Sequence, residues 1–140
     1  MNKEDKELLV KDLSARLPYG VKCSINNRTA PLELVGVVFE DDGEWYAKFG
    51  FTEMSIDHWH PKPYLKTMSS LTKEQKEEIN DYAWYNERHE IDENGMEIGW
   101  TRCFLRELDW YYKNHYDCNN LIDKGLALPA EEGMYENEEG

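Results

Sequence analysis

Residues 32–51 read LELVGVVFEDDGEWYAKFGF, with one apolar run on each side of Asp42-Gly43. This pattern predicts two antiparallel strands joined by a two-residue loop, because an Asp-Gly pair readily supplies the positive φ angles that a type I′ turn needs. The loop also sets the register between the strands. The predicted cross-strand pairs are Phe39 with Tyr46, Val38 with Ala47, Gly36 with Phe49, and Leu34 with Phe51.

Both faces of this hairpin are largely apolar. Each face must therefore be covered by another part of the protein, or the sheet must curl into a small barrel. We expect the two halves of the chain to form one cooperative unit for this reason. The first face holds Leu34, Val38, Trp45, Ala47, Phe49 and Phe51, and the second holds Val35, Val37, Phe39, Tyr46 and Lys48.

Further elements are expected on both sides of the hairpin in the sequence. Residues 3–17 place leucines four apart with charges between them, which predicts an amphipathic helix that ends before Pro18. The apolar period changes to two over residues 21–25, as in a strand. A further short strand is expected near residues 54–59, before a crossover to the second half of the chain.

Helical patterns dominate after residue 71. Thr72 and Gln75 form a capping box, which predicts a helix from about residue 73 to residue 89. A second helix is expected over about residues 101–115. A short last helix is expected over residues 117–124, capped by its first residue. The residues expected on the buried side of the first of these helices are Ile79, Tyr82 and Ala83.

These elements predict an α+β fold. It consists of an N-terminal helix, a small antiparallel β-meander or partly closed barrel of three or four strands over about residues 21–60, and two or three C-terminal helices packed on it. We expect a single domain over residues 1–130, with the helix and sheet in residues 1–61 and the helical half in residues 71–128. Residues 131–140 are expected to form an acidic, flexible tail.

The composition bounds the class of protein. Of the 140 residues, 40% are hydrophobic and 13% aromatic, so an intrinsically disordered protein is excluded for most of the chain. No apolar run is long enough to span a membrane, and the charged N-terminus differs from a secretory signal, so we expect a cytoplasmic protein. Three widely spaced cysteines are expected to be reduced. They are Cys23, Cys103 and Cys118.

The formal net charge of −13 is concentrated in the second half. Residues 1–70 carry 11 acidic and 9 basic side chains, whereas residues 71–140 carry 18 acidic and 7 basic ones. Direct binding to nucleic acid is not expected, because clustered Lys and Arg supply most of the affinity for a phosphate backbone. The charge favours a protein partner that is basic or binds nucleic acid.

Residues 56–63 read IDHWHPKP and raise the question of a metal site. On a strand, His58 and His60 would point to the same side, as two metal ligands require, and Trp59 would face inward. No third ligand follows at a recognisable spacing, so an exposed strand edge is the simpler interpretation. The candidates for a third ligand are Asp57, His89, His115, Cys103 and Cys118.

The sequence offers little that points to catalysis. His115 and Cys118 lie three residues apart, as a base and a nucleophile could, but a core cysteine is the simpler interpretation. The chain contains no phosphate-binding glycine-rich loop and neither a GxSxG nor an HExxH motif. We therefore expect a non-enzymatic protein with no catalytic residues and no cofactor.

Aromatic residues are dense among the acids of the second half. Most must be core, because large rings dominate burial. A surplus of rings with an acidic rim is also typical of a protein-binding surface, and both interpretations stay open here. The candidate partner-binding residues are Glu74, Glu77, Glu78, Asp81, Trp84, Tyr85, Trp110 and Tyr111.

Three segments carry a resemblance: LPYGVKC at 17–23, KPYLKTMSSLTKEQ at 62–75 and LDWYYKNHYDCNNLIDKGLALPAEEGMYE at 108–136. Together they resemble a family of small uncharacterised proteins from gut anaerobic bacteria and their phages or mobile elements. The resemblance implies a mobile-element setting, in which small acidic proteins often bind host proteins, and it implies no established activity. Family members do not usually carry HWH before the KPYL segment, which argues against a family-wide metal site at His58 and His60.

These features predict a non-enzymatic, acidic protein-interaction module of phage or mobile-element type. It would act as an inhibitor that covers a basic or nucleic-acid-binding surface of a host protein. Two alternatives stay open. One is a small metal-dependent enzyme or metal-binding protein that uses His58 and His60, and the other is a structural component of a larger assembly. The sequence predicts no oligomeric state.

Overall fold

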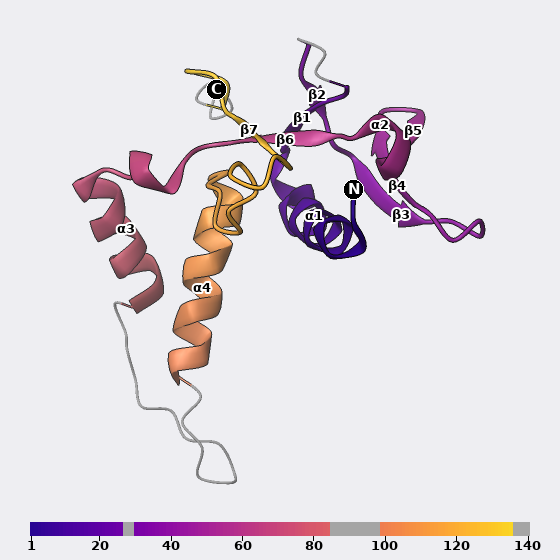
Figure 1. Ribbon diagram of the computed structural model, residues 1–140. Coiled ribbons are helices and arrows are strands. Elements are labelled where there is room, and N and C mark those ends of the chain that lie inside the picture. Colours follow the sequence, from indigo (N-terminus) through magenta and orange to yellow (C-terminus); the bar gives the residue numbers. More distant parts are fainter. Residues whose placement is uncertain (27–29, 85–98, 136–140) are drawn as a thin grey trace, which may run out of the picture.

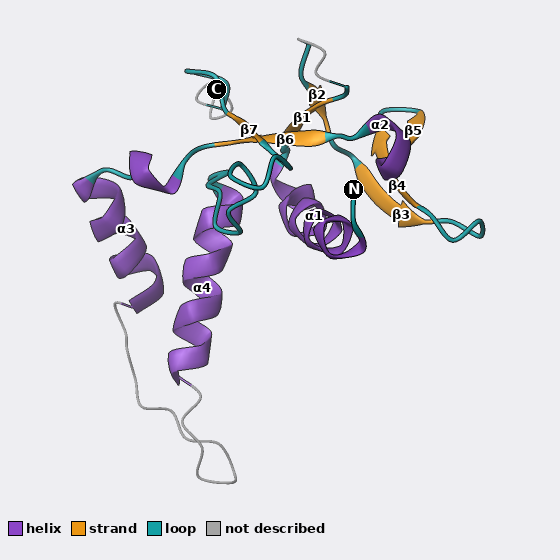
Figure 2. Cartoon of the chain, viewed as in Figure 1, coloured by secondary structure: helices purple, strands orange, loops and turns teal. Residues whose placement is uncertain are grey.

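The computed structural model describes residues 1–26, 30–84 and 99–135 and shows an α+β fold (Figure 1). It confirms the expected N-terminal helix, antiparallel strands and C-terminal helices, and Figure 2 separates the helical and strand regions by colour. The elements are α1 (Lys3–Arg16), the 3-10 helix η1 (Leu17–Tyr19), β1 (Lys22–Ser24), β2 (Leu32–Glu33), β3 (Gly36–Phe39), β4 (Trp45–Phe49), β5 (Thr52–Ser55), α2 (Ile56–Trp59), β6 (Lys62–Leu65), the 3-10 helix η2 (Met68–Ser70), α3 (Lys73–Trp84), α4 (Gly99–Lys113) and β7 (Leu128–Pro129).

The predicted hairpin is present, but its register differs by one residue from the prediction. It forms part of an antiparallel meander with the strand order β3-β4-β5. Phe39 pairs with Trp45, and Val38 pairs with Tyr46. A one-residue shift exchanges the two faces of a strand, so it changes which side chains of β3 enter the core.

The register differs because the hairpin loop is longer than two residues. The amide of Glu40 donates a 2.9 Å hydrogen bond to the carbonyl of Glu44, which leaves the three residues 41–43 in the loop. Gly43 has a φ of 83°, the left-handed conformation that commonly ends a three-residue loop. The Asp42 carboxylate accepts a hydrogen bond from the Glu44 amide at 2.9 Å, which supports the turn. The Asp-Gly signal therefore predicted the hairpin but not the loop length.

The shift places Val37, and not Val38, on the face that carries Ala47. This face packs into the main core. Phe51, which the prediction placed on the same face, follows the end of β4 and is fully exposed. The side chains that the meander contributes to the core are Val37, Trp45, Ala47, Phe49 and Met54.

A second sheet combines strands from distant parts of the chain in the order β2-β1-β6-β7. β1 pairs antiparallel with β2 and β6, whereas β7 pairs parallel with β6. The expectation that the sheet ends at residue 61 is therefore wrong. Pro61 and Pro63 lack a backbone N–H donor, and such residues commonly end a sheet. β6 tolerates them because it pairs with each neighbouring strand through only two residues.

One main core joins α1, both sheets and the chain after α4. In Figure 1, α1 lies beside β3, which it contacts. The same core extends to residues 121–127, so the N-terminal and C-terminal parts share buried surface. Its most deeply buried members include Leu9, Leu13, Val21, Cys23, Leu34, Ala47, Ile56, Leu65 and Leu121.

Helices α3 and α4 lie side by side and extend away from the two sheets (Figure 1). The predicted capping box begins α3, because the Gln75 amide donates to Thr72 Oγ1 at 3.1 Å and the Thr72 amide donates to Gln75 Oε1 at 2.8 Å. A second apolar cluster packs the two helices together. It is built on Ile79, Trp110 and Tyr116.

The chain after α4 forms turns where a short last helix was expected. The Asp117 carboxylate does cap backbone amides, since it accepts hydrogen bonds from Leu121 at 2.7 Å and Ile122 at 2.9 Å. Residues 118–125 nevertheless do not continue as a helix. A short capped segment gains few helical hydrogen bonds. The conformation of this one is therefore decided by tertiary packing, in which Leu121 is fully buried.

The expected flexible tail is wrong for its first part. Residues 131–135 fold back onto the second sheet, and the side chain of Tyr135 is buried there. Burial of this ring and hydrogen bonding of its hydroxyl outweigh the cost of ordering a short acidic segment. The last part of the expected tail, residues 136–140, lies outside the described residues.

Candidate functional site

Four acidic side chains form a stripe along α3. Glu74, Glu77, Glu78 and Asp81 are all exposed and lie three or four residues apart, which places them on one side of the helix. The buried residues Ile79 and Ala83 lie on the opposite side, against α4. We call these four residues the acidic stripe, and they share one exposed side of α3.

The two edges of the acidic stripe differ in chemistry. Lys73 and Lys76 line a shallow surface hollow together with Glu77, so one edge carries positive charge. Tyr82 borders the other edge and is 46% exposed, although the sequence placed it on the buried side. Its hydroxyl explains the difference, because it must reach a polar partner at the surface of the helix pair.

That partner is Asp109, which ties α3 to the rest of the molecule. The Tyr82 hydroxyl donates to one carboxylate oxygen at 3.2 Å, and the Tyr19 hydroxyl donates to the other at 2.6 Å. Arg106 also donates to the Ala83 carbonyl at 3.0 Å. The hydrogen bond with Asp109 raises the pKa of Tyr19, and burial together with the same carboxylate raises the pKa of Tyr82. These contacts hold the acidic stripe in a defined orientation.

The aromatic part of the predicted partner surface is only partly present. Trp110 is 5% exposed and stacks on Tyr116 at a centroid distance of 5.6 Å, so it is a core residue. Tyr111 is half-buried and contacts the edge of Trp110. Trp84 ends α3. Tyr85 lies outside the described residues. Among the α4 side chains that the structure describes, the exposed apolar ones are Phe104 and Leu105.

His58 and His60 do not lie on one strand. Residues 56–59 form the short helix α2, and His60 follows it with a φ of 45°, so strand alternation does not align the two imidazoles. Both imidazoles are exposed, and so is Trp59, which was expected to face inward. His89, one candidate third ligand, lies outside the described residues. Within residues 1–26, 30–84 and 99–135, no three His, Cys, Asp or Glu side chains are grouped to hold a metal ion.

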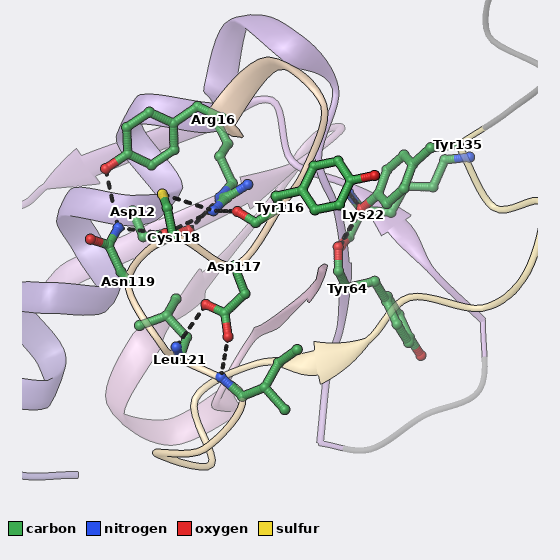
Figure 3. Close-up of polar contacts among 12 residues, drawn as sticks. Asp12, Arg16, Lys22, Tyr64, Tyr116, Asp117, Cys118, Asn119, Leu121 and Tyr135 are labelled. Carbon is green, nitrogen blue, oxygen red and sulfur yellow. Dashed lines mark hydrogen bonds and ion pairs between the residues drawn. The ribbon is translucent and has the colours of Figure 1, made fainter. Parts of the chain in front are cut away.

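A buried polar network, which the sequence analysis missed, is centred on Arg16 (Figure 3). Arg16 and Asp12 are both fully buried, and the guanidinium donates to the two carboxylate oxygens at 2.6 and 3.2 Å. It also donates to the Tyr116 carbonyl at 2.6 Å. Asn119 completes the network by donating to Asp12 at 2.9 Å. The network therefore joins α1 to the turn that follows α4.

A second buried contact joins the C-terminal segment to this turn. The ring of Tyr135 stacks on His115. Its hydroxyl accepts from the Lys22 amide at 3.0 Å and donates to the Tyr64 carbonyl at 2.8 Å (Figure 3). Burial is the main reason that the pKa of His115 falls to about 3, and the charge of Arg16 adds to it. His115 is therefore neutral at physiological pH.

The structure does not support His115 and Cys118 as a catalytic pair. The imidazole of His115 is buried against Tyr135, and Cys118 Sγ accepts a hydrogen bond from Arg16 at 3.9 Å. Burial raises the pKa of Cys118, which keeps the thiol protonated and weakly nucleophilic at neutral pH. Cys23 and Cys103 are buried free thiols, as expected for core cysteines.

No family model, curated protein or solved structure matches this chain. In the part of the chain that the structure describes, none of the helices has both the length and the apolar composition needed to cross a membrane. The acidic stripe is the surface feature that sequence and structure share.

Proposed function

We propose that this chain is a non-enzymatic protein-interaction module of phage or mobile-element type, which uses the acidic stripe to cover a basic or nucleic-acid-binding surface of a host protein. The observation that carries this proposal is the outward placement of all four predicted acids on α3. The helix also belongs to a pair that stands away from the sheets, where a partner can approach it (Figure 1).

The geometry of the acidic stripe suits a row of basic side chains. Side chains three and four residues apart on a helix have their Cβ atoms about 5–6 Å from one another, and the four acids span about 10 Å along the axis. A partner surface built to bind phosphates carries Lys and Arg at comparable separations, so the acidic stripe can occupy it in place of nucleic acid. The same charge repels nucleic acid itself.

The orientation of the acidic stripe strengthens the proposal. Asp109 and Arg106 fix α3 against α4 by hydrogen bonds, so the carboxylates are positioned before binding. A positioned surface loses less conformational entropy when it binds than a flexible one does. The acids of α3 therefore favour a specific partner over non-specific attraction to any basic protein.

The experiment is capture of partners from a lysate of gut anaerobic bacteria, followed by affinity measurement with the identified protein. We expect capture that weakens as salt is raised, because screening reduces attraction between exposed charges. The stripe variant replaces Glu74, Glu77 and Glu78 with Gln and Asp81 with Asn. We expect it to bind the partner about tenfold or more weakly.

The matched control removes the same number of charges elsewhere. It combines Glu4→Gln, Asp41→Asn, Asp123→Asn and Glu131→Gln, all at exposed positions outside α3. We expect this control to bind nearly as well as the unmodified protein. Equal binding by the stripe variant would overturn the electrostatic proposal, and selective co-purification with proteins encoded by the same mobile element would favour a structural component of an assembly.

A further inference from the structure

A pocket of about 330 Å³ lies between the first turns of α1, the start of β6 and the turn near residue 125. Its size is at the lower end of the range for sites that bind small molecules. None of the acidic-stripe residues lines it. The pocket is therefore a separate feature of the fold, and it includes the HPK part of the stretch IDHWHPKP.

Polar side chains surround this pocket without being used by the fold. Among the described residues, none of these side chains makes a hydrogen bond or an ion pair with another side chain or with the backbone. They bring one carboxylate, one amide, one imidazole and one ammonium group to a single pocket. They are Asp5, Asn26, His60 and Lys62.

Two of these four residues have an uncommon backbone conformation. Asn26 has a φ of 51° and His60 a φ of 45°, both in the left-handed region that non-glycine residues rarely adopt. The backbone N–H of Asn26 donates to the backbone carbonyl of Trp59 at 3.2 Å, and this hydrogen bond joins the two segments. Such conformations gather at ligand sites, where the surrounding structure pays their cost.

The remaining wall of the pocket is apolar. Leu9, Pro61 and Leu126 belong to this wall, and all three are buried, Leu9 fully. Asp5 and Lys62 line the same pocket but form no ion pair with each other in the described structure. A ligand with two opposite charges and an aliphatic part can therefore satisfy both groups and cover the apolar wall at once.

We propose that this pocket binds a small zwitterion with an aliphatic side chain, of the free α-amino acid class. The carboxylate of Asp5 binds the ligand ammonium group, and Lys62 binds the ligand carboxylate, with His60 beside it. The aliphatic side chain lies along the apolar wall beside Leu126. This inference is independent of the acidic stripe, since the two sites share no residue.

The test is titration of the full chain with L-leucine, followed by amide NMR shifts and calorimetry. We expect saturable shifts at the amides of Lys62, Gly125 and Leu126. We expect 4-methylpentanoate, which lacks the ammonium group, and 3-methylbutylamine, which lacks the carboxylate, each to bind about tenfold or more weakly. Equal binding of either probe would overturn the zwitterion assignment, and no shift at millimolar L-leucine would overturn the site.

Matched variants locate the two charges. Asp5→Asn and Lys62→Gln should each weaken L-leucine binding about tenfold or more, because each removes one charge-assisted contact. The controls Asp41→Asn and Lys11→Gln remove the same charges at exposed positions away from the pocket and should leave binding unchanged. Unchanged binding by both pocket variants would contradict the proposal, and circular dichroism confirms that each variant is folded.

Discussion

The imidazole of His115 stacks on the ring of Tyr135, with 3.9 Å between the ring centroids and 22° between the planes. The contact joins the turn after α4 to the end of the described chain. It also covers the imidazole so completely that Nδ1 has no hydrogen-bond partner among the described residues. Protonation would place a positive charge on a buried ring whose Nδ1 has no acceptor, so the neutral form is favoured and the contact depends on pH.

We predict that acid destabilises the fold through His115. Burial, together with the charges of Arg16 and Lys66, lowers the pKa of His115 from 6.5 to about 3. The unfolded chain binds a proton at His115 below about pH 6.5, whereas the folded chain does so only near pH 3. Stability is therefore full above pH 6.5 and is lost as the pH falls towards 3, by about 2 kcal/mol at pH 5.

The measurement is urea unfolding of the protein and of His115→Asn between pH 7.5 and pH 4. Asparagine accepts the left-handed backbone of this position, where φ is 63°, and it does not titrate. The free energy of unfolding should fall less steeply with acid in the variant. If the free energy of unfolding fell in parallel with pH for the two proteins, His115 would not titrate as described.

We predict that the segment up to Tyr135 is part of the folded structure. A chain ending at Gly133 loses the stacking on His115 and the hydrogen bonds to Lys22 and Tyr64, and it should be less stable than a chain ending at Tyr135 by about 2–4 kcal/mol. Urea unfolding of the two truncated chains measures the difference.

A point variant separates the ring from its hydroxyl. Tyr135→Phe keeps the stacking but removes the hydroxyl's hydrogen bonds to Lys22 and Tyr64, so its loss should be about 1–3 kcal/mol and smaller than that of the truncation. Equal stability of the two truncated chains would mean that Tyr135 does not contribute to folding.

Local signals predicted those elements whose causes are local. The capping box of Thr72 and Gln75 forms as expected because both of its hydrogen bonds join residues three apart. The hairpin around Gly43 was also predicted, but a three-residue loop fits the same Asp-Gly pair, and only packing of Val37 against the core selects between the registers.

Long-range contacts explain what the sequence could not predict. Asp12 and Arg16 are four residues apart, a spacing that surface ion pairs on helices also have, yet both are fully buried, and Arg16 donates to the carbonyl of Tyr116, 100 residues later. The acids of the acidic stripe were predictable from helical spacing alone. Trp110 was not, because its burial depends on stacking with Tyr116.

We predict that Asp12 and Arg16 are strongly coupled. Arg16→Met leaves a buried carboxylate without its cation and should destabilise the fold by about 3–5 kcal/mol. Asp12→Leu should cost a similar amount. The double variant should lose less free energy of unfolding than the sum of the two single variants, because neither charge is then left alone. Urea unfolding of the four proteins measures this coupling as a double-mutant cycle.

The same helix supplies the control for this cycle. Lys3 and Glu7 are also four residues apart, and they are exposed, with 3.9 Å between the charged atoms. Alanine at either position should change stability little, and the pair should show almost no coupling. Strictly additive losses at Asp12 and Arg16 would contradict a buried, mutually dependent pair.

We predict that the acidic stripe lowers the stability of the protein that carries it. Glu78 lies four residues after Glu74 and three before Asp81, so it repels both, and no lysine of α3 lies three or four residues from it. Glu78→Lys converts these repulsions to attractions and should raise the thermal midpoint by roughly 1–3 °C.

The salt dependence distinguishes this cause from a general effect of substitution. Added salt screens the repulsion and should stabilise the original protein more than Glu78→Lys. If the acidic stripe binds a basic partner, the same variant should bind this partner more weakly although it is more stable. Such a trade-off between stability and function is expected of a binding surface. A lower midpoint in Glu78→Lys would instead show that the acid at this position supports the fold.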